Sequence, residues 1–139
     1  MDYRECSEEL CQLYIDYAGV MNQTMDSVSA QGETGLLLWL SRRGQAAYPM
    51  DIARHFRISS GRVANILRKL EEKELVERRQ DKEDLRRISI SVTLAGREFA
   101  ERYYAQKREE HEKILRLLSE KDAQNLLRMI RQILSVTAS

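Results

Sequence analysis

Apolar residues recur at helical spacing over most of the chain and alternate in one short region. Over residues 3–28 they return every three or four positions, which predicts one long amphipathic helix. A shorter, buried helix is expected at "ETGLLLWLSRRG". Two arginines near its carboxyl end suit the helix dipole, and Gly44 suits a left-handed residue that ends it. The first third of the chain is therefore predicted to be helical.

Two short helices follow, with a tight turn between them. Pro49 fits the first turn of a helix that ends near Phe56, because proline lacks the amide hydrogen that a helix start leaves unpaired. Ser59 stands where an N-cap belongs, and the helix that it opens runs to about Lys73. The turn must lie between Phe56 and Ser59.

After this helix the spacing of apolar residues changes from about every 3.6 residues to every second residue. The stretches "LVERR" and "RRISISV" alternate apolar with polar residues, as half-buried antiparallel strands do, and "QDKED" between them has the composition of a turn. This pattern predicts a β-hairpin with Ile88, Ile90 and Val92 on one face.

Helical spacing returns after the hairpin. Thr93 is the expected N-cap of a helix that runs through Phe99, Tyr103 and Ile114 to Leu118. Ser119 and Asp122 have the spacing of a capping box and are expected to start a last helix, through Leu134. The fold class is therefore mainly α with one small β-hairpin.

Composition agrees with a single helical unit. The 139 residues are 42% hydrophobic and 32% charged, with six glycines and one proline, too few breaks for an all-β protein. No apolar run approaches the roughly 20 residues that cross a bilayer, and the acidic start "MDYRECSEEL" is unlike a secretory signal. We therefore expect a cytoplasmic protein without a membrane partner, whose two cysteines are reduced.

The net charge of +1 hides a strong segregation of charge. Residues 1–41 hold one basic residue against seven acidic ones, whereas residues 52–70 hold five basic residues and no acidic one. Residues 52–87 hold 11 Lys or Arg against 7 Asp or Glu, a local charge of +4. A local basic patch of this kind is typical of proteins that bind polyanions.

The helix at residues 59–73 has two distinct faces. One is apolar and should be buried; it comprises Val63, Ile66, Leu67 and Leu70. The opposite face is small and polar near its start, as a helix entering the major groove requires. Asn65 can bond adenine in two places, Arg68 can bond guanine likewise, and the Ala64 methyl can touch a thymine methyl.

Two short helices and a following hairpin together predict a winged helix-turn-helix. At the hairpin tip, Lys82, Arg86 and Arg87 are placed for phosphate or minor-groove contact. Asp84 lies two residues before Arg86 and can orient its guanidinium. The candidate DNA-binding residues are Ser59, Ser60, Arg62, Ala64, Asn65, Arg68, Lys69, Asp84, Arg86 and Arg87.

This arrangement resembles the MarR family of winged helix-turn-helix transcriptional regulators, over essentially the whole chain. The resemblance is carried by "MDIARHF", "SSGRVANILRKLEEKELVER", "DKEDLRR" and "VTLAG", the last similar to the L-T-x-x-G opening of a long dimerisation helix. It implies a homodimer whose residues 1–30 and 94–139 form the helical dimerisation region and whose residues 31–93 bind DNA. It also implies repression at a pseudo-palindromic operator, and release by a small aromatic effector bound near Tyr14, Tyr17, Met21 and Trp39.

The chain departs from the family pattern at four positions. Lys82 replaces a frequent proline and Leu85 a frequent arginine, which changes how the wing tip presents Arg86. Glu74 stands where glycine is usual, so the helix exit is expected to be capped differently. Asn65 replaces a frequent arginine, so an inherited sequence preference does not follow.

Two other functions fit parts of the sequence. The winged helix can serve as a protein-interaction module whose basic patch faces an acidic partner. Cys11, with tyrosines nearby, suggests a thiol-switched regulator, but four nearby acids (Glu5, Glu8, Glu9 and Asp16) raise a thiolate pKa and favour an inert core cysteine, and Cys6 is less suited still.

The sequence gives no reason to expect a cofactor, a metal or an enzyme. His55 and His111 lie in different segments, so they predict no metal site. The chain holds no glycine-rich phosphate loop, no G-x-S-x-G and no H-E-x-x-H motif.

Overall fold

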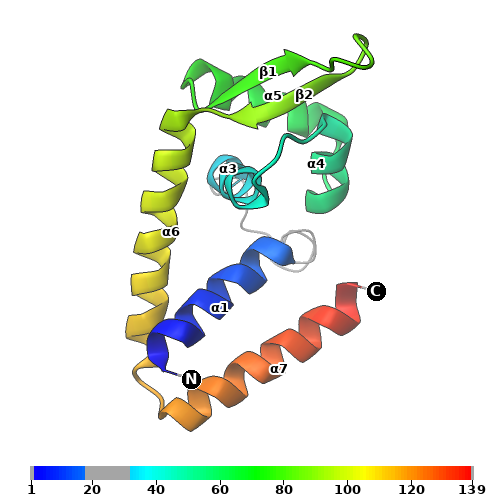
Figure 1. Cartoon of the computed structure of the whole chain (residues 1–139). Helices are drawn as coiled ribbons and strands as arrows, with labels where there is room; N and C mark the ends of the chain where they lie inside the picture. Colours follow the sequence, from blue (N-terminus) through cyan, green and yellow to red (C-terminus); the bar gives the residue numbers. More distant parts are fainter. Residues whose placement is uncertain (1, 18–31, 139) are drawn as a thin grey trace.

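The computed structural model describes residues 2–17 and 32–138 and confirms a mainly helical chain with one hairpin (Figure 1). The described elements, in chain order, are α1 (Tyr3–Asp16), α3 (Gly32–Arg43), α4 (Pro49–Phe56), α5 (Ser60–Glu72), β1 (Val76–Gln80), β2 (Ile88–Val92), α6 (Leu94–Leu115) and α7 (Glu120–Ala138). The helix predicted over residues 3–28 ends at Asp16, with Tyr17 as its C-cap, and residues 18–28 of that prediction lie outside the described residues.

The elements form two groups joined by α6. Figure 1 shows the hairpin, α4 and α5 at one end of the molecule and α1 and α7 at the other, with α6 running along one side between them. The antiparallel strands pair Val76 with Val92 and Gln80 with Ile88. A short bridge between Ala47 and Ile90 adds the segment before α4 to the sheet edge. The predicted helix-turn-helix and wing thus occupy one end.

Each group has its own buried cluster of apolar side chains. At the winged end the most buried large residues include Leu37, Ile52, Leu67 and Ile90, contributed by α3, α4, α5 and β2. At the other end the cluster joins α1, the end of α6 and α7; its members are Cys6, Leu13, Leu115, Ala123, Leu127 and Leu134. Burial of these side chains supplies the main driving force for packing the helices together.

The predicted N-caps are confirmed by local hydrogen bonds. The hydroxyl oxygen of Ser59 accepts from the amide of Arg62 at 3.2 Å, and that of Ser119 accepts from Asp122 at 3.1 Å. Each bond satisfies an amide that the first turn of a helix leaves without a partner. The starts of α5 and α7 are therefore fixed by sequence-local chemistry.

Left-handed residues end three helices, at Gly44, Arg57 and Glu74, with φ of +74°, +53° and +59°. At the end of α5 the amide of Leu75 donates to the Leu70 carbonyl (3.0 Å) and that of Glu74 to Glu71 (2.9 Å). These two bonds form a Schellman motif, whose left-handed position is usually glycine. The expectation that Glu74 caps this exit differently from glycine is therefore wrong, because Glu74 adopts the left-handed conformation in spite of its side chain.

The start of α6 is packed closely against the exit of α5. The Thr93 hydroxyl donates to the Glu74 carbonyl at 2.8 Å and accepts from the Gly96 amide at 3.0 Å. A Cβ atom at Gly96 would lie 2.0 Å from the Leu75 carbonyl oxygen. The threonine and glycine of "VTLAG" therefore join α6 directly to the end of α5.

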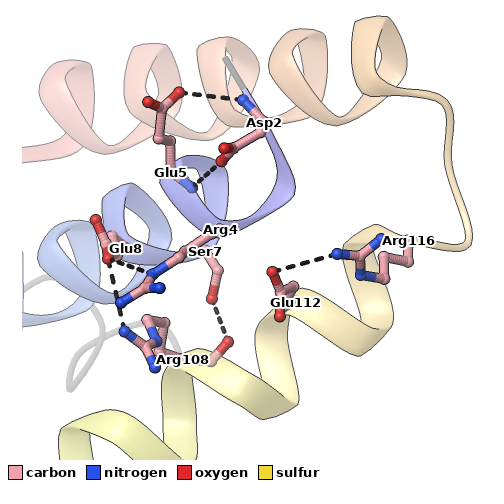
Figure 2. Close-up of polar contacts among 8 residues, drawn as sticks. All are labelled: Asp2, Arg4, Glu5, Ser7, Glu8, Arg108, Glu112 and Arg116. Carbon is pink, nitrogen blue, oxygen red and sulfur yellow. Dashed lines mark hydrogen bonds and ion pairs between the residues drawn. The ribbon is translucent and has the colours of Figure 1, made fainter.

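Polar contacts join α1 to α6 at Arg108 (Figure 2). The Ser7 hydroxyl donates to the Arg108 carbonyl, and Ser7 is fully buried. The Glu8 carboxylate lies 3.4 Å from the Arg4 guanidinium and 3.7 Å from that of Arg108. The two contacts to Arg108 join residues about 100 positions apart and fix the crossing of the two helices, whereas Arg4 and Glu8 pair within α1.

The long helix after the hairpin is shorter than predicted. It ends at Leu115 rather than Leu118, because the amides of Leu117 and Leu118 donate three residues back and tighten the last turn. Ile114 and Phe99, predicted to follow the apolar stripe, are 62% and 38% exposed within one chain. The inward side of α6 is instead formed by Gly96, Ala100, Tyr103, Tyr104 and Leu115.

Candidate nucleic-acid interface

The two faces of α5 are those predicted from the sequence. Its apolar residues Val63, Ile66, Leu67 and Leu70 are at most 8% exposed. The opposite face is open to solvent and comprises Ser60, Gly61, Arg62, Ala64, Asn65, Arg68 and Lys69. The first turns of this face carry no bulky apolar side chain, so a duplex groove can approach the backbone.

Two of the predicted base-reading residues are joined to each other. A guanidinium nitrogen of Arg68 (Nη2) donates to the side-chain carbonyl oxygen of Asn65 (Oδ1) at 2.6 Å, one helical turn away. Both side chains are exposed. The contact orients the Asn65 amide before any partner binds.

The wing tip presents Arg86 to solvent. Its Nε lies 3.2 Å from Asp84 Oδ1, and its side chain is 91% exposed. The same oxygen accepts from the Arg86 amide at 3.1 Å. The predicted bond between Asp84 and the Arg86 guanidinium is therefore confirmed, and it uses Nε while the side chain as a whole stays exposed.

Other cations of the hairpin are paired with acids. Arg78 contacts Glu71 at the end of α5, and Arg79 Nη2 lies 2.6 Å from Glu77. These pairs cancel charge locally, and residues 81–87 at the wing tip hold three acidic residues against three basic ones. The excess of positive charge at this end therefore comes mainly from residues 52–70, which hold five basic residues and no acidic one.

Arg87 packs against an aromatic ring. Its guanidinium carbon lies 3.7 Å from the centre of the Tyr48 ring, within the range of a cation–π contact. Tyr48 immediately precedes α4. Nothing in the local sequence pattern pointed to Tyr48, because the two residues are far apart along the chain.

Comparison with known proteins assigns the fold to a family. The model of the MarR family matches residues 31–88, from α3 into the hairpin. A solved structure of MarR is 30% identical, with a TM-score of 0.63 and coverage of 77% of this chain and 71% of that one. The chain belongs to the MarR family.

Other solved members of the MarR family match most of the chain. A complex of Staphylococcus aureus MepR with DNA is 26% identical, with a TM-score of 0.62 and coverage of 96% of this chain and 94% of that one. A crystal structure of MepR, a transcription regulator of the S. aureus multidrug efflux pump MepA, is 23% identical. Its TM-score is 0.64, and the match covers 91% of this chain and 92% of that one. No curated protein matches the chain by sequence.

The predicted effector residues of this MarR-family chain lie in separate clusters. Trp39 stacks on His55 with ring centres 4.5 Å apart, and Tyr14 stacks on His111 at 5.5 Å. Tyr17 packs with the cluster between α1 and α7. Met21 lies outside the described residues, and the aromatic effector pocket stays a prediction.

A polar hollow of about 310 Å³ lies between α1, α3 and α6. It is lined by Gln12, Ser41, Arg42, Arg97 and Glu101. None of the predicted aromatic residues lines it, and the sequence pattern did not suggest it because its residues come from three separate helices.

Cys11 is buried, and its environment does not favour a thiolate. Burial raises its pKa to about 11, although Arg108 and Arg42 nearby oppose the shift. The sequence showed only the acids along α1; the two arginines come from α6 and α3. Burial also raises the pKa of the Cys6 thiol. Both thiols are therefore protonated near neutral pH, as expected of core cysteines.

Two features are absent from residues 2–17 and 32–138, a metal site and a membrane-spanning helix. No group of three or more His, Cys, Asp or Glu residues there is placed to hold a metal ion. No helix in that part of the chain is long and apolar enough to span a bilayer.

Proposed function

We propose that this MarR-family chain is a sequence-specific regulator of transcription that binds duplex DNA as a homodimer. The observation that carries this proposal is the exposed polar face of α5, with Asn65 and Arg68, next to a wing that presents Arg86. The similarity to MepR, solved with DNA, supports it across nearly the whole chain.

In this proposal α5 enters the major groove and the wing lies along the backbone or the adjacent minor groove. Asn65, Arg68 and Ala64 read bases. The remaining predicted residues position the chain on the duplex: Ser59, Ser60, Arg62, Lys69, Asp84, Arg86 and Arg87. Contacts to phosphates fix register, whereas contacts to base edges give sequence preference.

A second copy of the chain is the proposed cover for an apolar surface at the far end of the molecule. Ile114, Leu117, Met129, Ile133 and Val136, on α6, α7 and the turn between them, are 45% to 84% exposed. Exposed apolar area of this extent is typical of an interface. A two-fold dimer places two α5 helices about 34 Å apart, which requires a pseudo-palindromic operator.

Three measurements test this proposal. Fluorescence anisotropy with duplex DNA should show affinity that falls steeply with salt, and selection from random duplexes should return a repeated, inverted half-site. Sedimentation should give a dimer that Ile133→Glu dissociates, with exposed Gln132→Glu as control. An acidic protein bound in place of DNA would favour a protein-interaction module.

Repression and release by an effector complete the proposal. A dimer bound across a promoter occludes it, and a ligand that favours a spacing of the winged ends incompatible with DNA would release it. The selection repeated with candidate small aromatic compounds tests this step. Release that depends on oxidation of Cys11, and is lost in Cys11→Ser, would favour a thiol switch instead.

A further inference from the structure

Three side chains connect the wing to the start of α4. The Tyr48 hydroxyl donates to Asp81 Oδ2. The guanidinium carbon of Arg87 lies over the Tyr48 ring, 3.7 Å from its centre. The amide of Asp81 donates to the Arg87 carbonyl at 2.9 Å. Tyr48, Asp81 and Arg87, here called the wing latch, therefore form a closed set of contacts.

Asp81 uses both carboxylate oxygens in this arrangement. While Oδ2 accepts from Tyr48, Oδ1 accepts from the Glu83 amide at 2.9 Å and holds the first turn of the wing tip. The bond to Tyr48 lowers the pKa of the Asp81 carboxyl and raises that of the Tyr48 phenol. The carboxylate thus remains charged and bonded throughout the neutral range.

The latch supplies a second attachment for the hairpin. Next to Tyr48, Ala47 and Ile90 exchange two backbone hydrogen bonds of 3.0 and 2.7 Å, which fix the hairpin near its middle. Tyr48 reaches further, to Asp81 just beyond the end of β1. Two attachments at different positions along the hairpin restrict its rotation relative to α4 more than one attachment does. The contact of Arg78 with Glu71 separately holds the base of the hairpin against α5.

We propose that Tyr48 and Asp81 are positioning residues that hold the wing, and with it Arg86, at a fixed place relative to α5, and that Arg87 serves this role through the Tyr48 ring. The inference rests on the proposed DNA-binding function. Tyr48 does not cap α4 through its side chain, because the phenol is directed to the wing and the Tyr48 amide instead donates to Asp51 Oδ2 at 3.2 Å.

Tyr48→Phe tests the latch, since it removes the hydroxyl and keeps the ring under Arg87. In the free protein, amide hydrogen exchange at Asp81 and Arg87 should become several-fold faster, while Tyr14→Phe, at another half-exposed tyrosine, should leave it unchanged. Unchanged exchange in Tyr48→Phe would overturn the latch whether or not the chain binds DNA.

The coupling to DNA is tested with the dimeric full chain and its selected duplex. Tyr48→Phe and Asp81→Asn should each weaken binding roughly three- to tenfold, the effect of one hydrogen bond, and the double variant no further. The loss should disappear in an Arg86→Ala background and persist in Arg68→Ala. A loss that persists undiminished in Arg86→Ala would overturn the role in positioning Arg86. If the wild-type chain bound no duplex at all, the proposed DNA-binding function would be wrong, whereas the latch would still be decided by the hydrogen-exchange measurement.

Discussion

The Arg68 guanidinium donates a hydrogen bond of 2.6 Å to the Asn65 side-chain carbonyl on the open face of α5. An amide carbonyl has two lone pairs, so this oxygen can accept from Arg68 and from an adenine amino group at once. The bond therefore fixes which way the Asn65 amide points, and the two residues should act together in reading DNA.

Asn65→Ala should cost about 1 to 3 kcal/mol of binding free energy at particular base pairs, and little on random duplex. Arg68→Ala should cost a similar amount, and the double variant less than the sum, because each residue orients the other. Anisotropy titrations of cognate and random duplex measure all three. Equal loss on both duplexes, or strict additivity, would contradict paired base reading.

Arg86→Ala should weaken binding to every duplex and reduce the slope of log affinity against log salt by about 1, the effect of losing one phosphate contact. Asp84→Asn should act in the same direction but less strongly, because it loosens Arg86 without removing its charge. Arg79→Ala is the matched control, since Arg79 is paired with Glu77 within the hairpin. An unchanged salt slope in Arg86→Ala would argue against a wing contact.

Gly96→Ala should destabilise the fold by about 1 to 3 kcal/mol, because the added methyl would overlap the Leu75 carbonyl and force α6 away from the α5 exit. Gly35→Ala provides the contrast. Beyond its chain neighbours and the local helix backbone, no atom lies within 4 Å of a Cβ added at Gly35, so alanine should stabilise α3 by about 1 kcal/mol. Urea unfolding followed by circular dichroism measures both, and a neutral Gly96→Ala would contradict the close packing.

Glu74→Gly should stabilise the fold by about 0.5 to 1 kcal/mol, because glycine adopts the left-handed conformation without the steric cost that a side chain brings. The control is Glu72→Gly, inside the last turn of α5, which should destabilise by a similar amount. Thermal melts of the two variants should therefore move in opposite directions. A shared direction would show that charge, rather than backbone conformation, dominates at the α5 exit.

Stability should fall as pH drops below about 6.5. Burial lowers the pKa of His55, although its Nε2 bond of 3.0 Å to the Ile15 carbonyl opposes the shift, and burial lowers that of His111. Between each lowered pKa and the ordinary value of 6.5 the unfolded chain binds more protons, so the folded state loses stability there.

Urea unfolding between pH 5 and 8 tests this dependence. The free energy of unfolding should be level above pH 7 and decline below it, and the decline should shrink in His55→Gln and again in the double variant with His111→Gln. A double variant that keeps the full slope would assign the effect to other groups.

Sequence-local physics predicted much of this fold. The caps at Ser59, Thr93 and Ser119 depend on bonds between residues three apart, and the buried stripe of α5 depends only on helical period. Contacts between distant segments were not predictable in the same way. Tyr48 meets Asp81 33 positions later, and Arg108 approaches Cys11 from another helix, because the packing of whole elements decides these distances.

In the candidate site, too, contacts between residues close in sequence were predicted and contacts between distant segments were not. The outward face of α5 and the pairing of Asp84 with Arg86 were predicted, since both lie within one or two turns of chain. The polar lining of the hollow at Arg42 and Arg97 was not, because α1, α3 and α6 must first pack together. The exposure of Ile114 was not predicted either, because the packing of α1, α3 and α7 against α6 decides which side of that helix is buried.

The bonds of Thr93 to Glu74 and Gly96 give the chain a mechanical property. They attach the exit of α5 firmly to the first turn of α6. The 22 residues of α6 then form a lever about 33 Å long, whose near end moves together with α5. A change in tilt of about 10° at the far end of such a lever displaces its near end by about 6 Å. A small rearrangement among α1, α6 and α7 is thereby magnified into a shift comparable to the width of a minor groove.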